Sequence, residues 1–263
     1  MKRRYLLGAL LGVMGLLLGG GFFIPQPVAA NEFKPIHPGT LTIGLEGTYA
    51  PFSYRNHGKL TGYEVEVAKA VAKEMHLKPK FVVTKWDSLL TGLDSQRYDV
   101  IFNNVGITKE RQRRYIFAEP YLYSKTVLIQ KKSGNMRHLK DIKGRKMAQS
   151  TSSNFGQLAK HNGAKIVPIP GMVEAMNLIK SGRADGELND AGAFERWHKS
   201  NQKAKIKAVN LDKEVPPIPA APLLNKRDKP LQHEMNRALK KLAKAGTLKK
   251  LSNKYFHMDL TKA

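Results

Sequence analysis

The feature that most constrains the fold is the alternation, from Leu41 onward, of short apolar runs with amphipathic helical patterns. Residues 41–45 (LTIGL) are typical of a buried strand, and residues 63–75 follow with the spacing of a helix. Such alternation is typical of α/β proteins. The same reasoning predicts strands at residues 81–83, 98–102, 125–129, 146–148, 166–167 and 184–188, and helices at 87–94 (with Asp87 as N-cap), 153–161, 173–179 and 191–198. Two basic amphipathic helices, with leucine stripes at 231–242 and 248–255, are predicted to close the chain.

The segment 98–121 (YDVIFNNVGITKERQRRYIFAEPY) carries the strongest functional signal. Thr108 is placed to cap a short helix, which puts Arg111 in the first helical turn. The helix dipole disfavours positive charge there, so an anionic ligand explains the arginine better. A guanidinium grips a carboxylate through two parallel hydrogen bonds. The alternative is a solvated arginine within the basic run 109–114.

Together with residues 47–75, this segment resembles the polar amino-acid-binding proteins that feed ABC importers, the bacterial solute-binding proteins of family 3. The resemblance runs from about residue 40 to residue 260. Residues 46–52 (EGTYAPF) and 103–105 (NNV) look most like the cystine receptors and the basic surface protein of lactobacilli. It implies a type II periplasmic-binding-protein fold, with two α/β lobes joined by a two-segment hinge near Ser124 and Ala220. The implied organisation is a signal peptide at 1–30, lobe 1 at 31–123, lobe 2 at 124–219 and a return to lobe 1 at 220–263.

The first 30 residues have the pattern of a secretory signal: a basic start, an apolar stretch and small residues before Asn31. An uncleaved membrane anchor is the alternative. The chain contains no cysteine, which excludes both a lipid-attachment cysteine and disulfides, and also thiol exchange with a disulfide ligand.

The formal net charge is +24. Residues 1–30 hold three of the positive charges and no negative ones, so cleavage would leave +21. Because the predicted signal peptide would direct the protein out of the cell, this charge favours an anionic cell wall over nucleic acid as the binding partner. The expected location is the surface of a Gram-positive bacterium, with a Gram-negative periplasm as the alternative.

The ligand site implied by the resemblance has three parts. Arg111, helped by backbone near Gly106, would bind the ligand's carboxylate, and the loop 150–154 would close over it. Ser152 stands where the related receptors usually have glycine. Asp190 would contact the ammonium, although it could equally cap the helix after it. The full set is Glu46, Tyr49, Phe52, Trp86, Asn103, Asn104, Gly106, Arg111, Ser150, Ser152, Ser153, Asn154 and Asp190.

Glu46, Tyr49, Phe52 and Trp86 are the expected side-chain pocket, with Phe52 alternatively only a core residue. Glu46 could meet a second ammonium, which cystine carries and a neutral amino acid lacks. Arginine or lysine would satisfy it as well.

No histidine pair, Walker loop, dinucleotide fingerprint or serine elbow is present in the sequence after the signal, so neither an enzyme nor a cofactor is predicted. A related dehydratase branch uses the same scaffold, and fold alone does not fix chemistry. The expected partners are an amino acid, with cystine favoured, a membrane permease and anionic wall polymers, for a monomeric protein. The alternative function is a charge-held surface adhesin.

Overall fold

The computed structural model describes residues 33–262. The predicted signal at 1–30 lies outside them. None of the helices in the described region is both long and apolar enough to cross a membrane. The described chain forms two five-stranded sheets, each with helices on both faces, and the α/β prediction is confirmed.

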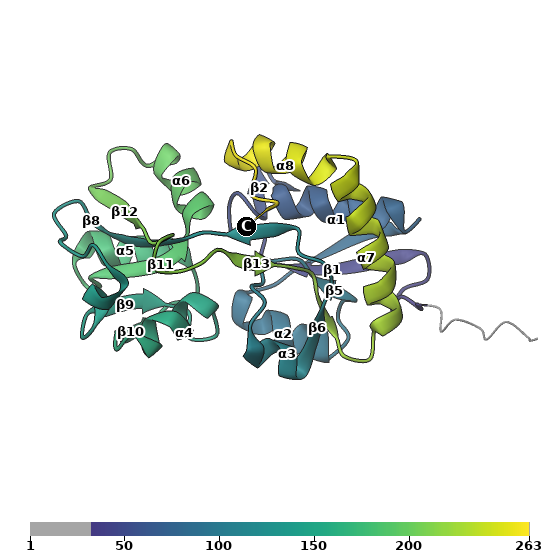
Figure 1. The fold of residues 1–263 in the computed structure, drawn as a ribbon, viewed down its shortest axis with the longest axis horizontal. Helices are drawn as coiled ribbons and strands as arrows, with labels where there is room; N and C mark the ends of the chain where they lie inside the picture. The colour runs from purple at the N-terminus through teal and green to yellow at the C-terminus, as the bar shows by residue number, and fades with distance from the viewer. Residues whose placement is uncertain (1–32, 263) are drawn as a thin grey trace, which may run out of the picture. The chain divides into compact units, whose positions relative to one another are not determined.

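The first sheet has the strand order β4-β1-β5-β14-β6 and defines what we call the first lobe (Figure 1). The first three strands of this order run parallel, and β14 pairs antiparallel with both β5 and β6. The strands are β1 (Thr40–Leu45), β4 (Lys78–Val83), β5 (Val100–Ile101), β6 (Tyr115–Phe117) and β14 (Leu223–Asn225). A separate hairpin, β2 (Tyr54–Asn56) and β3 (Lys59–Thr61), precedes the first helix.

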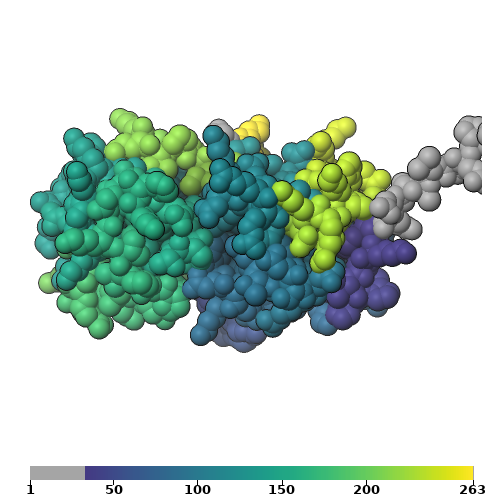
Figure 2. Space-filling model, turned by 90° about the horizontal axis from the view of Figure 1, so that it is seen from below, coloured from purple at the N-terminus to yellow at the C-terminus, as the bar shows by residue number. Residues whose placement is uncertain are grey.

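Five helices belong to this lobe: α1 (Tyr63–Glu74), α2 (Trp86–Asp94), α3 (Lys109–Arg114), α7 (Lys229–Lys244) and α8 (Thr247–Phe256). Helices α1, α7 and α8 pack on one another and bury one face of the sheet. Helix α2 packs on the opposite face through Leu89 and Leu93. The two C-terminal helices therefore complete a lobe that the N-terminal segment begins, and Figure 2 shows their yellow and yellow-green residues against purple and blue ones.

The second sheet has the order β10-β9-β11-β8-β12 and defines the second lobe. Its strands are β8 (Thr126–Lys131), β9 (Lys146–Gln149), β10 (Lys165–Pro168), β11 (Gly186–Asp190) and β12 (Ile206–Asn210). Its helices are the 3-10 turn η1 (Leu139–Ile142), α4 (Asn154–His161), α5 (Met172–Ser181) and α6 (Ala191–Ser200). Val127 and Ile129 of β8 face the core under α5 and α6, and Leu128 faces the core under α4. Burial on both faces explains why this strand is apolar without alternation.

Two short strands, β7 (Leu122–Ser124) and β13 (Ile218–Ala220), carry the chain between the sheets (Figure 1). They pair antiparallel, with Ser124 opposite Ile218 and Leu122 opposite Ala220. Pro219 lies in β13, where a two-stranded ribbon tolerates a missing N–H. The sequence boundaries at 123/124 and 219/220 stay a prediction.

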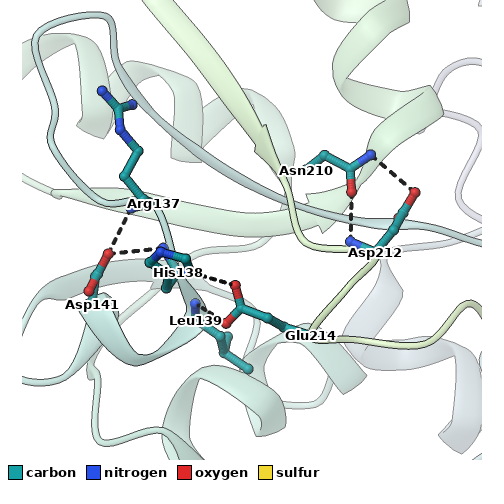
Figure 3. Close-up of polar contacts among 7 residues, drawn as sticks. All are labelled: Arg137, His138, Leu139, Asp141, Asn210, Asp212 and Glu214. Carbon is teal, nitrogen blue, oxygen red and sulfur yellow. Dashed lines mark hydrogen bonds and ion pairs between the residues drawn. The ribbon is translucent and has the colours of Figure 1, made fainter.

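A polar cluster ties the loop before η1 to the segment after β12 in the second lobe (Figure 3). The Asp141 carboxylate accepts from the backbone N–H groups of Arg137 and His138. Glu214 accepts from the Leu139 N–H at 2.9 Å and lies 3.0 Å from His138 Nδ1. These exposed contacts lie beside buried residues of the same two segments, Met136, Ile142, Leu211 and Val215, which pack in one core cluster.

Candidate functional site

An open cavity lies between the two lobes, with about 550 Å³ of empty space that includes solvent at its mouth. The residues lining it are Glu46, Tyr49, Trp86, Asn103, Asn104, Gln149, Ser150, Ser153, Asn154, Phe155, Ile169, Pro170, Gly171, Met172, Glu187, Leu188 and Asn189. Eight of the predicted site residues lie in this lining, whereas Phe52, Gly106, Arg111, Ser152 and Asp190 do not.

Arg111 is the buried cation of the site. Thr108 caps α3 by accepting the Arg111 N–H, as predicted, and only 7% of Arg111 is exposed. Its guanidinium donates to the Gly106 carbonyl at 2.9 Å and to the Ser152 carbonyl at 3.2 Å, and it lies over the Trp86 ring. Burial lowers the Arg111 pKa to about 10, so the group stays charged at neutral pH. No carboxylate in residues 33–262 forms an ion pair with it, which leaves room for an anionic ligand group.

The loop 150–154 of the second lobe faces α2 of the first. Ser153 caps α4 by accepting the Gly156 N–H, as predicted. Asp87 was predicted to cap α2, and this is wrong: the helix begins one residue earlier, with Lys85 at the cap position. Asp87 instead accepts hydrogen bonds from the hydroxyls of Ser150 (3.1 Å) and Ser152 (2.5 Å), which join the two lobes.

Two glycines, Gly156 and Gly106, lie where a side chain would clash with the loop or with the hinge. A Cβ on Gly156 would lie 2.1 Å from the Ser150 carbonyl oxygen. A Cβ on Gly106 would lie 2.8 Å from Ile218 and 3.6 Å from the Asn154 side chain of the other lobe. Gly106 thus permits the close approach of loop and hinge, and its carbonyl, rather than its N–H, contacts Arg111.

Glu46 and Asn103 form a pair at the ends of β1 and β5. The Asn103 amide donates to Glu46 Oε2 at 3.0 Å and accepts from the Glu46 N–H at 2.8 Å. The pKa of Glu46 is raised, mainly because the residue is buried. The hydrogen bond from Asn103 opposes this shift, and the negative charge of Asp87 adds to it. The asparagine holds the carboxylate at the cavity wall.

Tyr49 crosses from the first lobe to the second. Its hydroxyl donates to Asn189 Oδ1 at 2.7 Å, and its ring stacks on Phe52 at 5.0 Å. The pKa of Tyr49 is raised well above its usual value. Burial is the largest cause, and the negative charges of Asp190, Glu187 and Glu46 raise it further. Phe52 is fully buried in the first-lobe core, so it supports Tyr49 from behind.

Three buried polar atoms of lining residues have no hydrogen-bond partner within the described chain: Trp86 Nε1, Asn104 Oδ1 and Glu187 Oε2. Buried polar atoms are normally satisfied, so unpaired ones at a cavity wall are available to a ligand. Asn104 has a positive φ of 46°, and its backbone N–H donates to the Glu64 carboxylate beneath it. Trp86 and Asn104 therefore present unpaired polar atoms at the cavity wall, and their contact with a ligand stays a prediction.

Asp190 caps α6. One carboxylate oxygen accepts from the N–H groups of Gly192 and Ala193, and the other accepts from the Ser124 hydroxyl. Burial raises the Asp190 pKa to about 6, opposed by these hydrogen bonds and by Asn104. The capping alternative is what the structure contains, and the ammonium contact stays a prediction.

Sequence reasoning missed the lining residues Gln149, Phe155, Ile169, Pro170, Gly171, Met172, Glu187, Leu188 and Asn189. A signal for two of them was present. Glu187 and Asn189 are two positions apart in a strand, and side chains with this spacing share a face. Polar residues at alternate positions of a fully buried strand indicate a functional face.

No group of three or more potential metal ligands occurs in the described region.

The match to known proteins is extensive. The model of the bacterial extracellular solute-binding proteins, family 3, matches residues 41–258. The chain belongs to this family. A probable amino-acid ABC transporter-binding protein of Haemophilus influenzae is 40% identical over 84% of this chain and 86% of its own. The L-cystine-binding protein TcyA of Bacillus subtilis is 39% identical over 85% of this chain and 84% of its own.

A solved structure gives the same result for the fold. The L-cystine solute receptor of Neisseria gonorrhoeae, in its unliganded open conformation, superposes with a TM-score of 0.59 at 40% identity, over 85% of this chain and 95% of that one. The predicted two-lobed periplasmic-binding-protein fold is confirmed.

Proposed function

We propose that this protein is the extracellular amino-acid-binding component of an ABC importer and that its ligand is L-cystine. The observation that carries the proposal is the distribution of charge at the cavity. Arg111 lies buried behind one wall without an acidic partner among the described residues, and Glu46 and Glu187 line the cavity with no lysine, arginine or histidine beside them in the lining. Cystine has two ammonium groups and two carboxylates, so its ammonium groups complement the glutamates and one carboxylate complements Arg111.

The middle of the cavity suits the rest of such a ligand. Phe155, Ile169 and Met172 supply apolar side chains to the lining, to which Tyr49 also belongs. The central –CH₂–S–S–CH₂– unit of cystine is apolar and polarisable, and methionine and aromatic groups contact sulfur favourably. Relatives with cystine in their names support the same choice.

Calorimetric titration with L-cystine, glutamine, histidine and arginine tests the proposal. Cystine should bind most tightly and raise the melting temperature, since a ligand that binds only the folded state stabilises it. Because the chain has no cysteine, a reductant acts on the ligand alone, and dithiothreitol should abolish the response without altering the free protein. Tight binding of glutamine or histidine with none of cystine would overturn the assignment.

Charge supports a second role, retention at an anionic cell envelope. The chain without residues 1–30 carries +21, and exposed charge attraction weakens as the Debye length falls from about 8 Å at physiological salt to about 3 Å at 1 M. Washing cells with molar salt should release the protein. Persistence in the membrane fraction would favour an uncleaved anchor. An Arg111→Ala variant separates the two roles, because electrostatic adhesion does not need an intact cavity.

A further inference from the structure

We propose that Glu187 is the residue of this site that binds the second, side-chain ammonium of the ligand, and so selects amino acids with two cationic groups. The inference rests on the proposed function for the identity of the ligand. It adds a specificity residue on the second lobe to Glu46 on the first.

Glu187 is buried and incompletely satisfied. Only 2% of the residue is exposed, and it lies in β11, opposite Ile129 of β8. Its Oε1 accepts from the Asn189 amide at 2.7 Å, whereas its Oε2 has no partner anywhere in residues 33–262. Since Glu187 lines the cavity, the ligand is the available source of a partner.

The surroundings of Glu187 lack a cation. The titratable groups near this wall are Tyr49, Glu46 and Asp190, with Glu64 beyond Asn104, and all are acidic or neutral. Burial raises the pKa of Glu187 well above its usual value, and the Asn189 hydrogen bond opposes this. A buried carboxylate kept without a cation costs stability, and an incoming ammonium offsets that cost.

Glu187 is connected through Asn189 to Tyr49, which the sequence predicts to line the side-chain pocket. Asn189 joins them, donating to Glu187 and accepting from the Tyr49 hydroxyl. Arg111 instead contacts Ser152 and Gly106. Arg111 has no hydrogen bond to any member of the Tyr49–Asn189–Glu187 chain in the described residues.

Glu187→Gln tests the proposal, because it keeps the shape and the acceptor for Asn189 and removes only the charge. Titration should compare cystine and lysine, which carry two ammonium groups, with S-methylcysteine, which carries one. We expect the variant to lose about 30-fold or more for cystine, the low end of the cost of removing one partner of a buried charge pair. The S-methylcysteine affinity should change by less than about threefold. Glu195→Gln, an exposed change of the same charge in the same lobe, is the control.

Proton release provides a readout that a structural role would not affect. An ammonium that binds Glu187 lowers its pKa, so cystine binding should release a proton from the wild-type protein. Calorimetry in buffers of different ionisation enthalpy measures this release, which should fall in Glu187→Gln.

The outcomes are separable. Equal loss for cystine and S-methylcysteine, or no loss for either, overturns the assignment of Glu187 while leaving cystine binding by the wild type intact. Wild-type protein that binds lysine but not cystine, with lysine binding lost in Glu187→Gln, overturns the proposed ligand and keeps the role of Glu187. Wild-type protein that binds neither diamino acid overturns both.

Discussion

Arg111 and Glu187 have opposite charges but similar surroundings. Each is almost completely buried at the cleft, and neither has a counter-charge within the described chain. Burial disfavours the charged form of both, lowering the arginine pKa and raising the glutamate pKa. With a pKa of about 10, Arg111 remains a cation across the physiological range, whereas the carboxylate can take up a proton. The carboxylate-binding end is therefore fixed in charge, and pH acts on the ammonium-binding end.

The largest effect is expected from Arg111→Ala, which removes one side of this comparison. A ligand carboxylate would be buried without its charged partner, at a cost of about 2–5 kcal/mol of binding. Folding should survive, because the N-cap of α3 is the Thr108 hydroxyl and the Arg111 backbone, neither of which is altered. Calorimetry measures the affinity, and Arg113→Ala, an exposed neighbour, is the matched control. Unchanged affinity would show that the guanidinium has no part in binding.

Glu64→Gln sharpens the comparison by testing a buried carboxylate that lies beneath the cavity instead of lining it. Burial raises the Glu64 pKa from 4.5 to about 7, so the folded protein holds this proton more tightly than the unfolded chain does. Below pH 4.5 the carboxyl group therefore does not destabilise the folded protein. As pH rises from 4.5 to about 7 it lowers the free energy of unfolding, and above pH 7 this loss stays constant. The variant should be more stable than wild type by about 1–3 kcal/mol at pH 8, with the difference shrinking toward pH 4.5.

Chemical denaturation at several pH values measures this difference. The control is Glu66→Gln, two residues along the same helix. The Glu66 carboxylate accepts from Lys254 and Tyr255, and these contacts lower its pKa despite an opposing effect of burial. Its contribution is present at neutral pH and lost in acid, so Glu66→Gln should give a difference of the opposite sign. If Glu64→Gln is destabilised at every pH, the hydrogen bonds of Glu64 outweigh the cost of its burial.

Tyr49→Phe probes the link between the two ends. The change removes the hydroxyl that donates to Asn189 and leaves the ring stacked on Phe52. One hydrogen bond contributes about 0.5–1.5 kcal/mol, so cystine affinity should fall several-fold. Tyr54→Phe is the comparison, since no hydrogen bond of its hydroxyl occurs in the described structure. A Tyr49→Phe protein that binds as well as wild type would show that Asn189 needs no support from the first lobe.

Asp87→Asn should have the smallest effect. Its bonds with the Ser150 and Ser152 hydroxyls are exposed, so their loss should weaken binding by about 0.5 kcal/mol. The change should appear as faster ligand dissociation in stopped-flow measurements, because these bonds hold the lobes together after the ligand has entered. A slower association rate with unchanged dissociation would contradict that interpretation.

Sequence periodicity predicted most of the core strands and helices because those elements bury regular apolar faces. The hairpin at 54–61 and the edge strand Ile206–Asn210 were missed, since their residues are largely polar or half-exposed. The three-residue strands β6 and β14 were missed as well, because they are too short to show a period.

The site was predictable where local chemistry was unusual for its position. Arg111 stood out as a cation in a first helical turn, and Ser153 as a cap. Residues such as Ile169 and Met172 carry no local sign of their place at the cavity, because only the meeting of the two lobes puts them there. Asp87 was wrongly predicted as a cap for the same reason: its hydrogen-bond partners lie more than 60 positions away.

The position of β14 has a consequence for how the protein reaches its native state. This strand lies between β5 and β6, although more than 100 residues separate it from either. The second sheet is built from one continuous stretch of chain, residues 126–210, and can form as soon as that stretch is available. The first sheet, which starts earlier, lacks the strand that joins β5 to β6 until residues 223–225 arrive. In a chain synthesised from its N-terminus, the second lobe can therefore be completed before the first. Until then the apolar strands of the first lobe remain partly uncovered.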